Sequence, residues 1–130
     1  MGAKKIEHVG LMVNNLETSI AFYEQIAGFK LRAIEPHTNG VIRLAFLSHP
    51  EAPDTELELI EGYNSGLPAE GKVHHVAFAT GDIEREWERL KGLNVPFIDA
   101  EITTLPSGAR YFFFYGPVGE WLEFFEPPAV

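Results

Sequence analysis

The stretch KVHHVAFAT, residues 72 to 80, closely matches an earlier stretch of the same chain, KIEHVGLMV, residues 5 to 13. Aligning the two places His75 on His8 and Ala77 on Gly10. Both stretches are short apolar runs with the length and composition of a β-strand. The match therefore predicts that the chain consists of two similar halves.

An amphipathic helix is expected to follow each of these strands. In the first half the helix can be capped by Asn14 or Asn15 and can end at Gly28. Its inward face would carry Leu16, Ile20, Tyr23 and Ile26. In the second half the helix would run from Asp82 to Gly92. Its inward residues would be Ile83, Trp87 and Leu90.

Strand-like apolar runs follow both helices: the first half has GVIRLAFL and ELELIEGY, and the second has ARYFFFYG and EWLEFFEP. Each half is thus predicted to be a βαβββ module, giving an α+β fold with tandem modules at about residues 5–63 and 72–127. The stretch between them, NSGLPAEG at residues 64–71, is typical of a linker. Because 130 residues is the size of one domain, we expect a single domain over residues 1–130.

A second sequence match lies at the ends of the two halves. ELELIE, residues 56–61, resembles WLEFFE, residues 121–126, so that Glu58 falls on Glu123. The His-to-Glu intervals are 58 − 8 = 50 and 123 − 75 = 48 residues, which are nearly equal. The repeated unit therefore contains one histidine and one glutamate.

Strand alternation predicts which side chains share a face. It places four residues on the sheet face away from the helices: His8, Glu58, His75 and Glu123. His74 falls on the helix side of the sheet and is expected to be a rim or capping residue, not a ligand. Taken singly, a strand histidine is more often structural, and either glutamate could lie on an exposed edge strand. Two imidazoles and two carboxylates on a covered face instead predict a divalent metal, because a buried carboxylate needs a compensating cation.

Composition excludes several classes of function. The formal charge of −9 disfavours binding to nucleic acid or to an anionic membrane. The absence of Cys excludes disulfides, thiolate nucleophiles and Cys-ligated zinc. No apolar run approaches the length of a membrane span, and the N-terminus does not have the pattern of a signal peptide. We therefore expect a cytoplasmic protein.

The order of these motifs resembles the vicinal oxygen chelate superfamily and, within it, glyoxalase I (lactoylglutathione lyase). The resemblance spans residues 5–127 and is carried by HVGLMVNNLETSIAFYEQIAGFKL, LAFL, ELELIE, HHVAF and EWLEFFEPP. It implies a metal held by His8, Glu58, His75 and Glu123. It also implies a homodimer in which the first-half pair of one chain meets the second-half pair of the other.

The resemblance further implies a reaction. The leading hypothesis is a metal-dependent conversion of the hemithioacetal of a 2-oxoaldehyde such as methylglyoxal and a thiol cosubstrate into a 2-hydroxyacyl thioester. Glu58 and Glu123 are the candidate catalytic residues, with Glu123 favoured as the base. Oxygen and nitrogen ligands in sixfold coordination suit Ni, Co, Mn or Zn.

Two alternatives stay open. One is an epimerase of the methylmalonyl-CoA type, a family that tends to carry Gln where Glu58 stands. The other is a metal-free module that sequesters a small apolar or aromatic compound. Within the family pattern, Met12 replaces an Arg that similar bacterial glyoxalases often carry, and residues 116–119 replace a turn resembling Asp-Pro-Asp-Gly.

Three further groups of residues have open roles. Three arginines are candidates for holding a substrate carboxylate: Arg32, Arg43 and Arg110. The aromatic run from Tyr111 to Tyr115 is either a core strand or a strand whose alternate rings line a pocket. Three glutamates that flank the candidate ligands are expected to be solvated or interface carboxylates: Glu56, Glu61 and Glu126.

Overall fold

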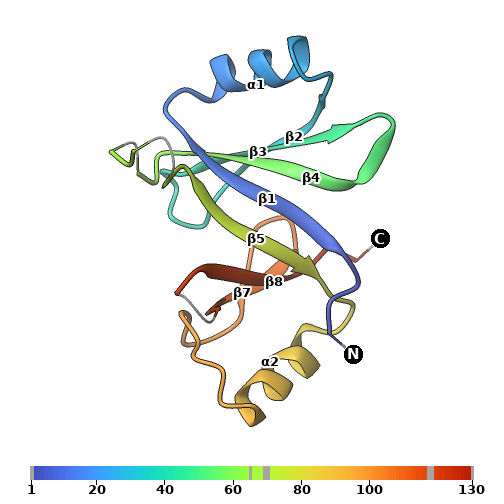
Figure 1. Ribbon diagram of the computed structural model, residues 1–130, viewed down its shortest axis with the longest axis vertical. Helices are drawn as coiled ribbons and strands as arrows, with labels where there is room; N and C mark the ends of the chain where they lie inside the picture. The colour runs from blue at the N-terminus through green and yellow to red at the C-terminus, as the bar shows by residue number, and fades with distance from the viewer. Residues whose placement is uncertain (1, 65, 69–70, 117–118, 130) are drawn as a thin grey trace. The chain divides into compact units, whose positions relative to one another are not determined.

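The computed structural model describes residues 2–64, 66–68, 71–116 and 119–129. The first half contains β1 (Ile6–Val13), α1 (Leu16–Gln25), β2 (Lys30–Pro36), β3 (Arg43–His49) and β4 (Ala52–Glu61). The second contains β5 (Val73–Ala79), α2 (Ile83–Gly92), β6 (Thr103–Thr104), β7 (Arg110–Tyr115) and β8 (Trp121–Glu126) (Figure 1). This order is βαβββ repeated, so the predicted α+β fold with two tandem modules is confirmed.

The chain divides into two compact units, His8–His74 and Met1–Glu7 with His75–Val130. The predicted linker, residues 64–71, includes residues 65, 69 and 70, which lie outside the described part of the chain. Residues 117 and 118 of the predicted turn also lie outside it. The single-domain organisation and its boundaries therefore stay a prediction.

The unit His8–His74 holds α1 and a sheet with the strand order β2-β3-β4-β1. β1 is parallel to β4, whereas β3 pairs antiparallel with both β2 and β4. The β1–β4 register places His8 opposite Glu56 and Gly10 opposite Glu58. The β3–β4 register places Phe46 opposite Glu58. These pairings position the candidate ligands of the first half on adjacent strands.

The two faces of this sheet carry separate apolar clusters. The cluster beneath α1 consists of Leu16, Ile20, Ala45, Leu47 and Leu59. The cluster on the face that His8 shares with Met12 consists of Met12, Leu44, Phe46 and Ile60. Strand alternation produces this separation, as the sequence pattern predicts.

The unit formed by Met1–Glu7 and His75–Val130 repeats the plan, with the strand order β5-β8-β7-β6. β5 is parallel to β8, and β7 pairs antiparallel with both β8 and β6. The registers place both Ala77 and Phe113 opposite Glu123. The cluster beneath α2 contains Ile83, Leu90, Phe112, Phe114 and Phe124. The cluster on the other face contains Ala77, Leu105, Ala109, Tyr111 and Phe125.

The helices begin where the sequence predicts. The side chain of Asn15 accepts the backbone N–H of Thr18, and Asp82 caps α2 in the same way. The prediction for Ile26 is wrong, because this residue follows the last helical residue and is 71% exposed. Phe29, beyond the turn at Gly28, packs against the cluster beneath α1 instead.

An ion-pair cluster ties the start of α1 to the end of β4. The guanidinium of Arg43 contacts Glu17 at 3.0 Å and Glu61 at 2.9 Å. Glu61 also accepts the N–H of Leu16, the first residue of α1, at 2.8 Å. Hydrogen bonding to Arg43 lowers the pKa of Glu17. Arg43 therefore has a structural role, and the expectation of a solvated Glu61 is wrong.

The second module repeats this cluster around α2. Arg110 contacts both Glu84 and Glu126, and Glu126 accepts the N–H of Ile83 at 3.0 Å. Arg110 and Glu126 are thus structural as well, which corrects the roles expected from the sequence.

Neither helix in the described part of the chain has the length and hydrophobicity of a membrane span.

Candidate functional site

The first His–Glu pair lies within the unit His8–His74. The Nε2 atom of His8 is 3.6 Å from Oε1 of Glu58. Both residues are buried: His8 is 0% exposed and Glu58 is 6% exposed. Gly10 lies opposite Glu58 in the β1–β4 register, so no side chain of β1 competes with the glutamate at that position. The sequence-predicted residues of the first half are therefore brought together.

An aromatic ring completes the surroundings of this pair. Phe46 lies opposite Glu58 across β3–β4 and is 2% exposed. Its ring meets the His8 imidazole edge-to-face, with the ring centroids 6.3 Å apart. Because the imidazole packs against a buried ring, its orientation is restricted.

The second His–Glu pair lies within the other unit and has the same design. The Nε2 atom of His75 is 3.3 Å from Oε1 of Glu123, and each residue is 4% exposed. Phe113, opposite Glu123 across β7–β8, meets the His75 ring edge-to-face at 4.9 Å. Each module thus places a histidine, a glutamate and a phenylalanine in equivalent positions.

The donor chemistry of these pairs fits a divalent metal. An imidazole nitrogen and a carboxylate oxygen 3.3 to 3.6 Å apart can both turn to a single cation. An ionised carboxylate at 4 to 6% exposure is costly unless a cation or strong donors compensate it. Nitrogen and oxygen ligands of this kind suit Ni, Co, Mn or Zn. The role of all four residues as ligands stays a prediction.

His74 has different neighbours from His75. Its ring packs against Tyr63, with centroids 4.9 Å apart and the ring planes at 74°. Tyr63 itself is half exposed. His74 therefore belongs to a partly exposed aromatic contact, in keeping with the expected position at a rim.

The aromatic run of β7 contributes to apolar clusters on both faces of its sheet, and a pocket lined by its alternate rings stays a prediction. Phe112 and Phe114 pack in the cluster beneath α2. Tyr111 and Phe113 belong to the cluster on the face of His75 and Glu123. Alternate residues of one strand thus supply the core and the surroundings of the second pair.

Asp99 is a carboxylate near the second pair that sequence reasoning missed. Its Oδ2 atom accepts the backbone N–H of Phe113 at 2.7 Å. Burial raises the pKa of Asp99, the hydrogen bond from Phe113 lowers it, and the negative charge of Glu123 raises it further. Asp99 lies in the connection between α2 and β6, where no motif marks it.

Arg32 contacts Phe46, the ring that packs against His8. Its Nε and Nη2 atoms donate to the two carboxylate oxygens of Glu56 at 2.6 and 2.8 Å. The guanidinium lies over the ring of Phe46, 5.1 Å from its centroid. Glu56 is therefore engaged in a bidentate ion pair, which the sequence did not predict.

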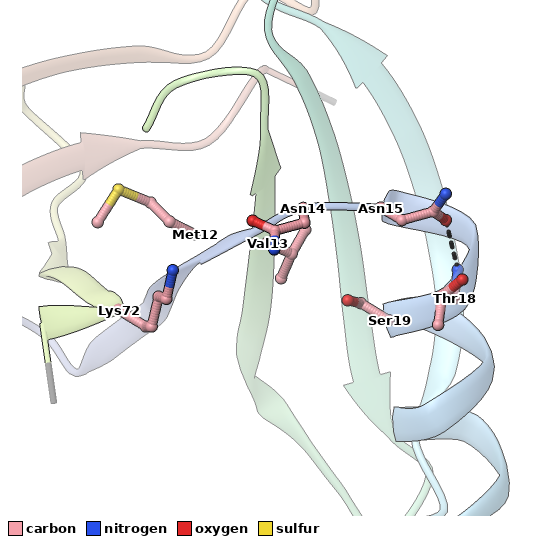
Figure 2. Close-up of a pocket in the computed structure, with 7 residues that line it drawn as sticks. All are labelled: Met12, Val13, Asn14, Asn15, Thr18, Ser19 and Lys72. Atoms are coloured by element: carbon pink, nitrogen blue, oxygen red, sulfur yellow. Dashed lines mark hydrogen bonds between the residues drawn. The ribbon is translucent and has the colours of Figure 1, made fainter. Parts of the chain in front are cut away.

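A pocket opens where β1 meets α1 (Figure 2). It has a volume of about 330 Å³ and is lined by Met12, Val13, Asn14, Asn15, Thr18, Ser19 and Lys72. The carbonyl of Lys72 accepts the N–H of Met12 at 2.9 Å, which fixes the lysine beside β1. Figure 2 shows the amide of Asn15 turned to Thr18, where it caps α1.

Comparisons with known proteins agree with this architecture. The Bacillus subtilis (strain 168) protein named "Uncharacterized protein YwbC" is 56% identical over 124 residues, covering 95% of this chain and 98% of that protein. Lactoylglutathione lyase of Neisseria meningitidis serogroup A is 32% identical over 89 residues, covering 67% of this chain and 64% of that enzyme.

Solved structures share the fold. Methylmalonyl-CoA epimerase from Mycobacterium tuberculosis has a TM-score of 0.85 at 20% identity, with 98% of this chain and 90% of that chain covered. A family model matches residues 5–124, nearly the whole chain. The chain therefore belongs to the Glyoxalase/Bleomycin resistance protein/Dioxygenase superfamily, whose members include lyases and epimerases.

Proposed function

We propose that the chain is a metal-dependent lyase of the glyoxalase I type, which converts the hemithioacetal of methylglyoxal or a similar 2-oxoaldehyde into a 2-hydroxyacyl thioester. The repeated buried His–Glu pair carries this proposal, because it supplies four matched ligands. The similarity to lactoylglutathione lyase supports it. We also propose that the protein is cytoplasmic.

The chemistry is a proton transfer between two neighbouring carbons. His8, Glu58, His75 and Glu123 would hold a divalent metal, which would supply stabilisation for the negative charge that develops on the substrate. A carboxylate of this set accepts the proton from the carbon that bears sulfur and returns it to the former carbonyl carbon, while the hydroxyl proton of the first carbon moves to the oxygen of the second. Glu123 is the favoured base, with Glu58 as the second candidate.

The surrounding residues protect this proton transfer from solvent. Phe46 and Phe113 pack against the two imidazoles and hold their ring orientations. Apolar walls limit the access of water, which strengthens electrostatic interactions within the site. The proton can then remain on the glutamate between its removal and its return.

Assembly is part of the proposal, because the resemblance to glyoxalase I implies that modules from two chains combine to complete each ligand set. We propose a homodimer with two equivalent centres, in which His8 and Glu58 of one protomer combine with His75 and Glu123 of its partner. Such an isologous interface is common among two-fold dimers.

A second candidate is an epimerase that inverts a carbon next to a thioester carbonyl. It is favoured by the solved structures with this fold, several of which are methylmalonyl-CoA epimerases. The chemistry is similar, because a proton again leaves a carbon beside a carbonyl. Glu58 favours the lyase, since the epimerase family tends to have Gln there.

Elemental analysis combined with a substrate panel tests the two candidates. Protein loaded with Ni, Co, Mn or Zn would be assayed with methylglyoxal and several small thiols, and with methylmalonyl-CoA in D₂O. Formation of a thioester supports the lyase, and deuterium incorporation into methylmalonyl-CoA supports the epimerase. A stripped protein that binds none of the metals would contradict both and support sequestration of a small molecule.

A further inference from the structure

The turn that joins β2 to β3 carries an asparagine followed directly by a glycine, Asn39 and Gly40. None of the other four asparagines of the chain precedes a glycine: Asn14, Asn15, Asn64 and Asn94. The backbone nitrogen that follows an asparagine can attack the carbon of its side-chain amide. Glycine hinders this attack least because it has no Cβ. Asn39 is therefore the asparagine whose sequence context most favours loss of its amide group.

The native turn leaves this pair open to water. Asn39 and Gly40 are both exposed, and the next residue, Val41, is 69% exposed. The backbone of Gly40 has a φ of +73°, and a Cβ added to it would meet no atom within 4 Å. No neighbouring side chain therefore covers the pair on that side.

The side chain of Asn39 is held through its oxygen. The Oδ1 atom accepts the backbone N–H groups of Val41 at 2.9 Å and of Ile42 at 3.0 Å. Two such donors stabilise the negative charge that this oxygen acquires when the amide carbon is attacked, as donors do in an oxyanion hole. The turn thus favours attack on the side chain electrostatically, while the amide nitrogen faces solvent as the leaving group.

One contact of the turn opposes the attack. The N–H of Gly40 donates to the carbonyl oxygen of His37 at 3.1 Å, so this hydrogen bond must open before the nitrogen can react. Backbone hydrogen bonds of exposed turns open at low free energy compared with those of the core. The folded turn should therefore slow the reaction only modestly relative to the unfolded chain.

We propose that Asn39 is a site of spontaneous deamidation in the folded protein. The nitrogen of Gly40 bonds to Cγ of Asn39, its proton leaves with the side-chain amide group as ammonia, and the two residues form a succinimide ring. Water then opens the ring at one of its two carbonyl carbons, which gives either aspartate or isoaspartate. Isoaspartate lengthens the main chain by one methylene, four residues before Arg43, which holds the start of α1.

Incubation of the folded protein at neutral pH, followed by trypsin digestion and mass spectrometry, tests this. Cleavage after arginine and lysine places Asn39 in residues 33–43 and Asn64 in residues 44–72, each without a second asparagine. Asn64 is the matched internal control: it is exposed and its Oδ1 accepts a backbone N–H at 2.9 Å, but a serine follows it. The same incubation in urea gives the rate in the unfolded chain.

We expect residues 33–43 of the folded protein to gain the mass difference between a hydroxyl and an amino group faster than residues 44–72 do. The rate should lie within about tenfold of the rate in urea. Asn39→Gln should remove most of this gain, because its ring closure would need a larger ring. Aged wild type should also unfold at a lower urea concentration than fresh Asn39→Asp, whose main chain is normal. A mass gain confined to the unfolded chain, or equal rates at Asn39 and Asn64, would overturn the proposal.

Discussion

At the scale of single residues, the alternation of side chains along a strand separates two adjacent histidines into different surroundings. His75 lies 3.3 Å from Glu123 and is buried, whereas His74 packs against the half-exposed ring of Tyr63. The sequence predicted this difference because only one of two neighbours can share a face with His8. It did not predict Asp99, whose hydrogen bond to Phe113 joins segments without a shared motif.

The two histidines should respond differently to substitution. His75→Ala is expected to abolish metal binding and activity together. His74→Ala should leave the metal dissociation constant within about tenfold, the low end of effects from residues that only neighbour ligands. Isothermal titration calorimetry on both variants measures this. Loss of metal in His74→Ala but not in His75→Ala would contradict the parity assignment and the alignment of the halves.

The glutamates can be separated into a ligand role and a proton-transfer role. Gln keeps the shape of Glu and a coordinating oxygen but has no useful basicity. At least one of Glu58→Gln and Glu123→Gln should therefore retain metal while losing turnover, and we favour Glu123. Metal content and kcat for both variants test this. Full activity in both variants would show that neither glutamate is the base.

Asp99 predicts a dependence of stability on pH. Burial raises its pKa in the folded state, so the protonated carboxyl is favoured by folding. This contribution is fully present below the pKa of the unfolded chain and is lost as pH rises through the folded value. Asp99→Asn keeps an oxygen to accept the Phe113 N–H and carries no charge. In metal-free protein we expect it to raise the urea midpoint at pH 7 and to change it little below pH 4; a lower midpoint at pH 7 would contradict the burial argument.

At the scale of secondary-structure elements, the capping residues in the sequence predicted where the helices begin. They did not predict the hydrogen bonds that distant strands make to the helix starts. Asn15 and Asp82 cap α1 and α2 as the sequence indicated. The carboxylates of Glu61 and Glu126 come from distant strands, so no local pattern shows that they accept helix N–H groups. The position of Arg32 also depends on an irregular strand pairing, which a regular alternation cannot reveal.

These long-range hydrogen bonds should contribute to the free energy of unfolding. Glu61→Ala removes the acceptor for the Leu16 N–H, and Glu126→Ala removes that for Ile83. Each should lower the free energy of unfolding by about 1 kcal/mol, as for the loss of a helix cap. Glu88→Ala, at an exposed position of α2, is the control and should have a smaller effect. Urea denaturation compares the three; an effect no larger than the control would show that these acceptors are dispensable.

At the scale of the whole molecule, the internal repeat made the fold predictable. Matching strands, helices and end motifs together indicated two βαβββ modules, and the structure confirms them. The repeat could not indicate what differs between modules, such as Glu56 in one and Trp121 in the other. A repeat indicates only what the two halves share, so it cannot assign a role to positions at which they differ.

The assembly is predicted at this scale too. With metal bound, the protein should sediment at about twice the 14.5 kDa mass of the chain at micromolar concentration. The reason is the proposed pairing of modules from two protomers at each metal centre. Analytical ultracentrifugation of metal-loaded protein measures the mass. A metal-bound monomer would show that pairing within one chain suffices.

The central claim is that the two His–Glu pairs form a single kind of metal centre with four protein ligands. Titration of the stripped protein with Co(II), followed by absorption spectroscopy, tests it most directly when wild type, His8→Ala and His75→Ala are compared. The account predicts one ion per chain, a weak spectrum typical of six-coordinate cobalt, and loss of tight binding in both variants. Two ions per chain, or tight binding of one ion by either variant, would contradict it.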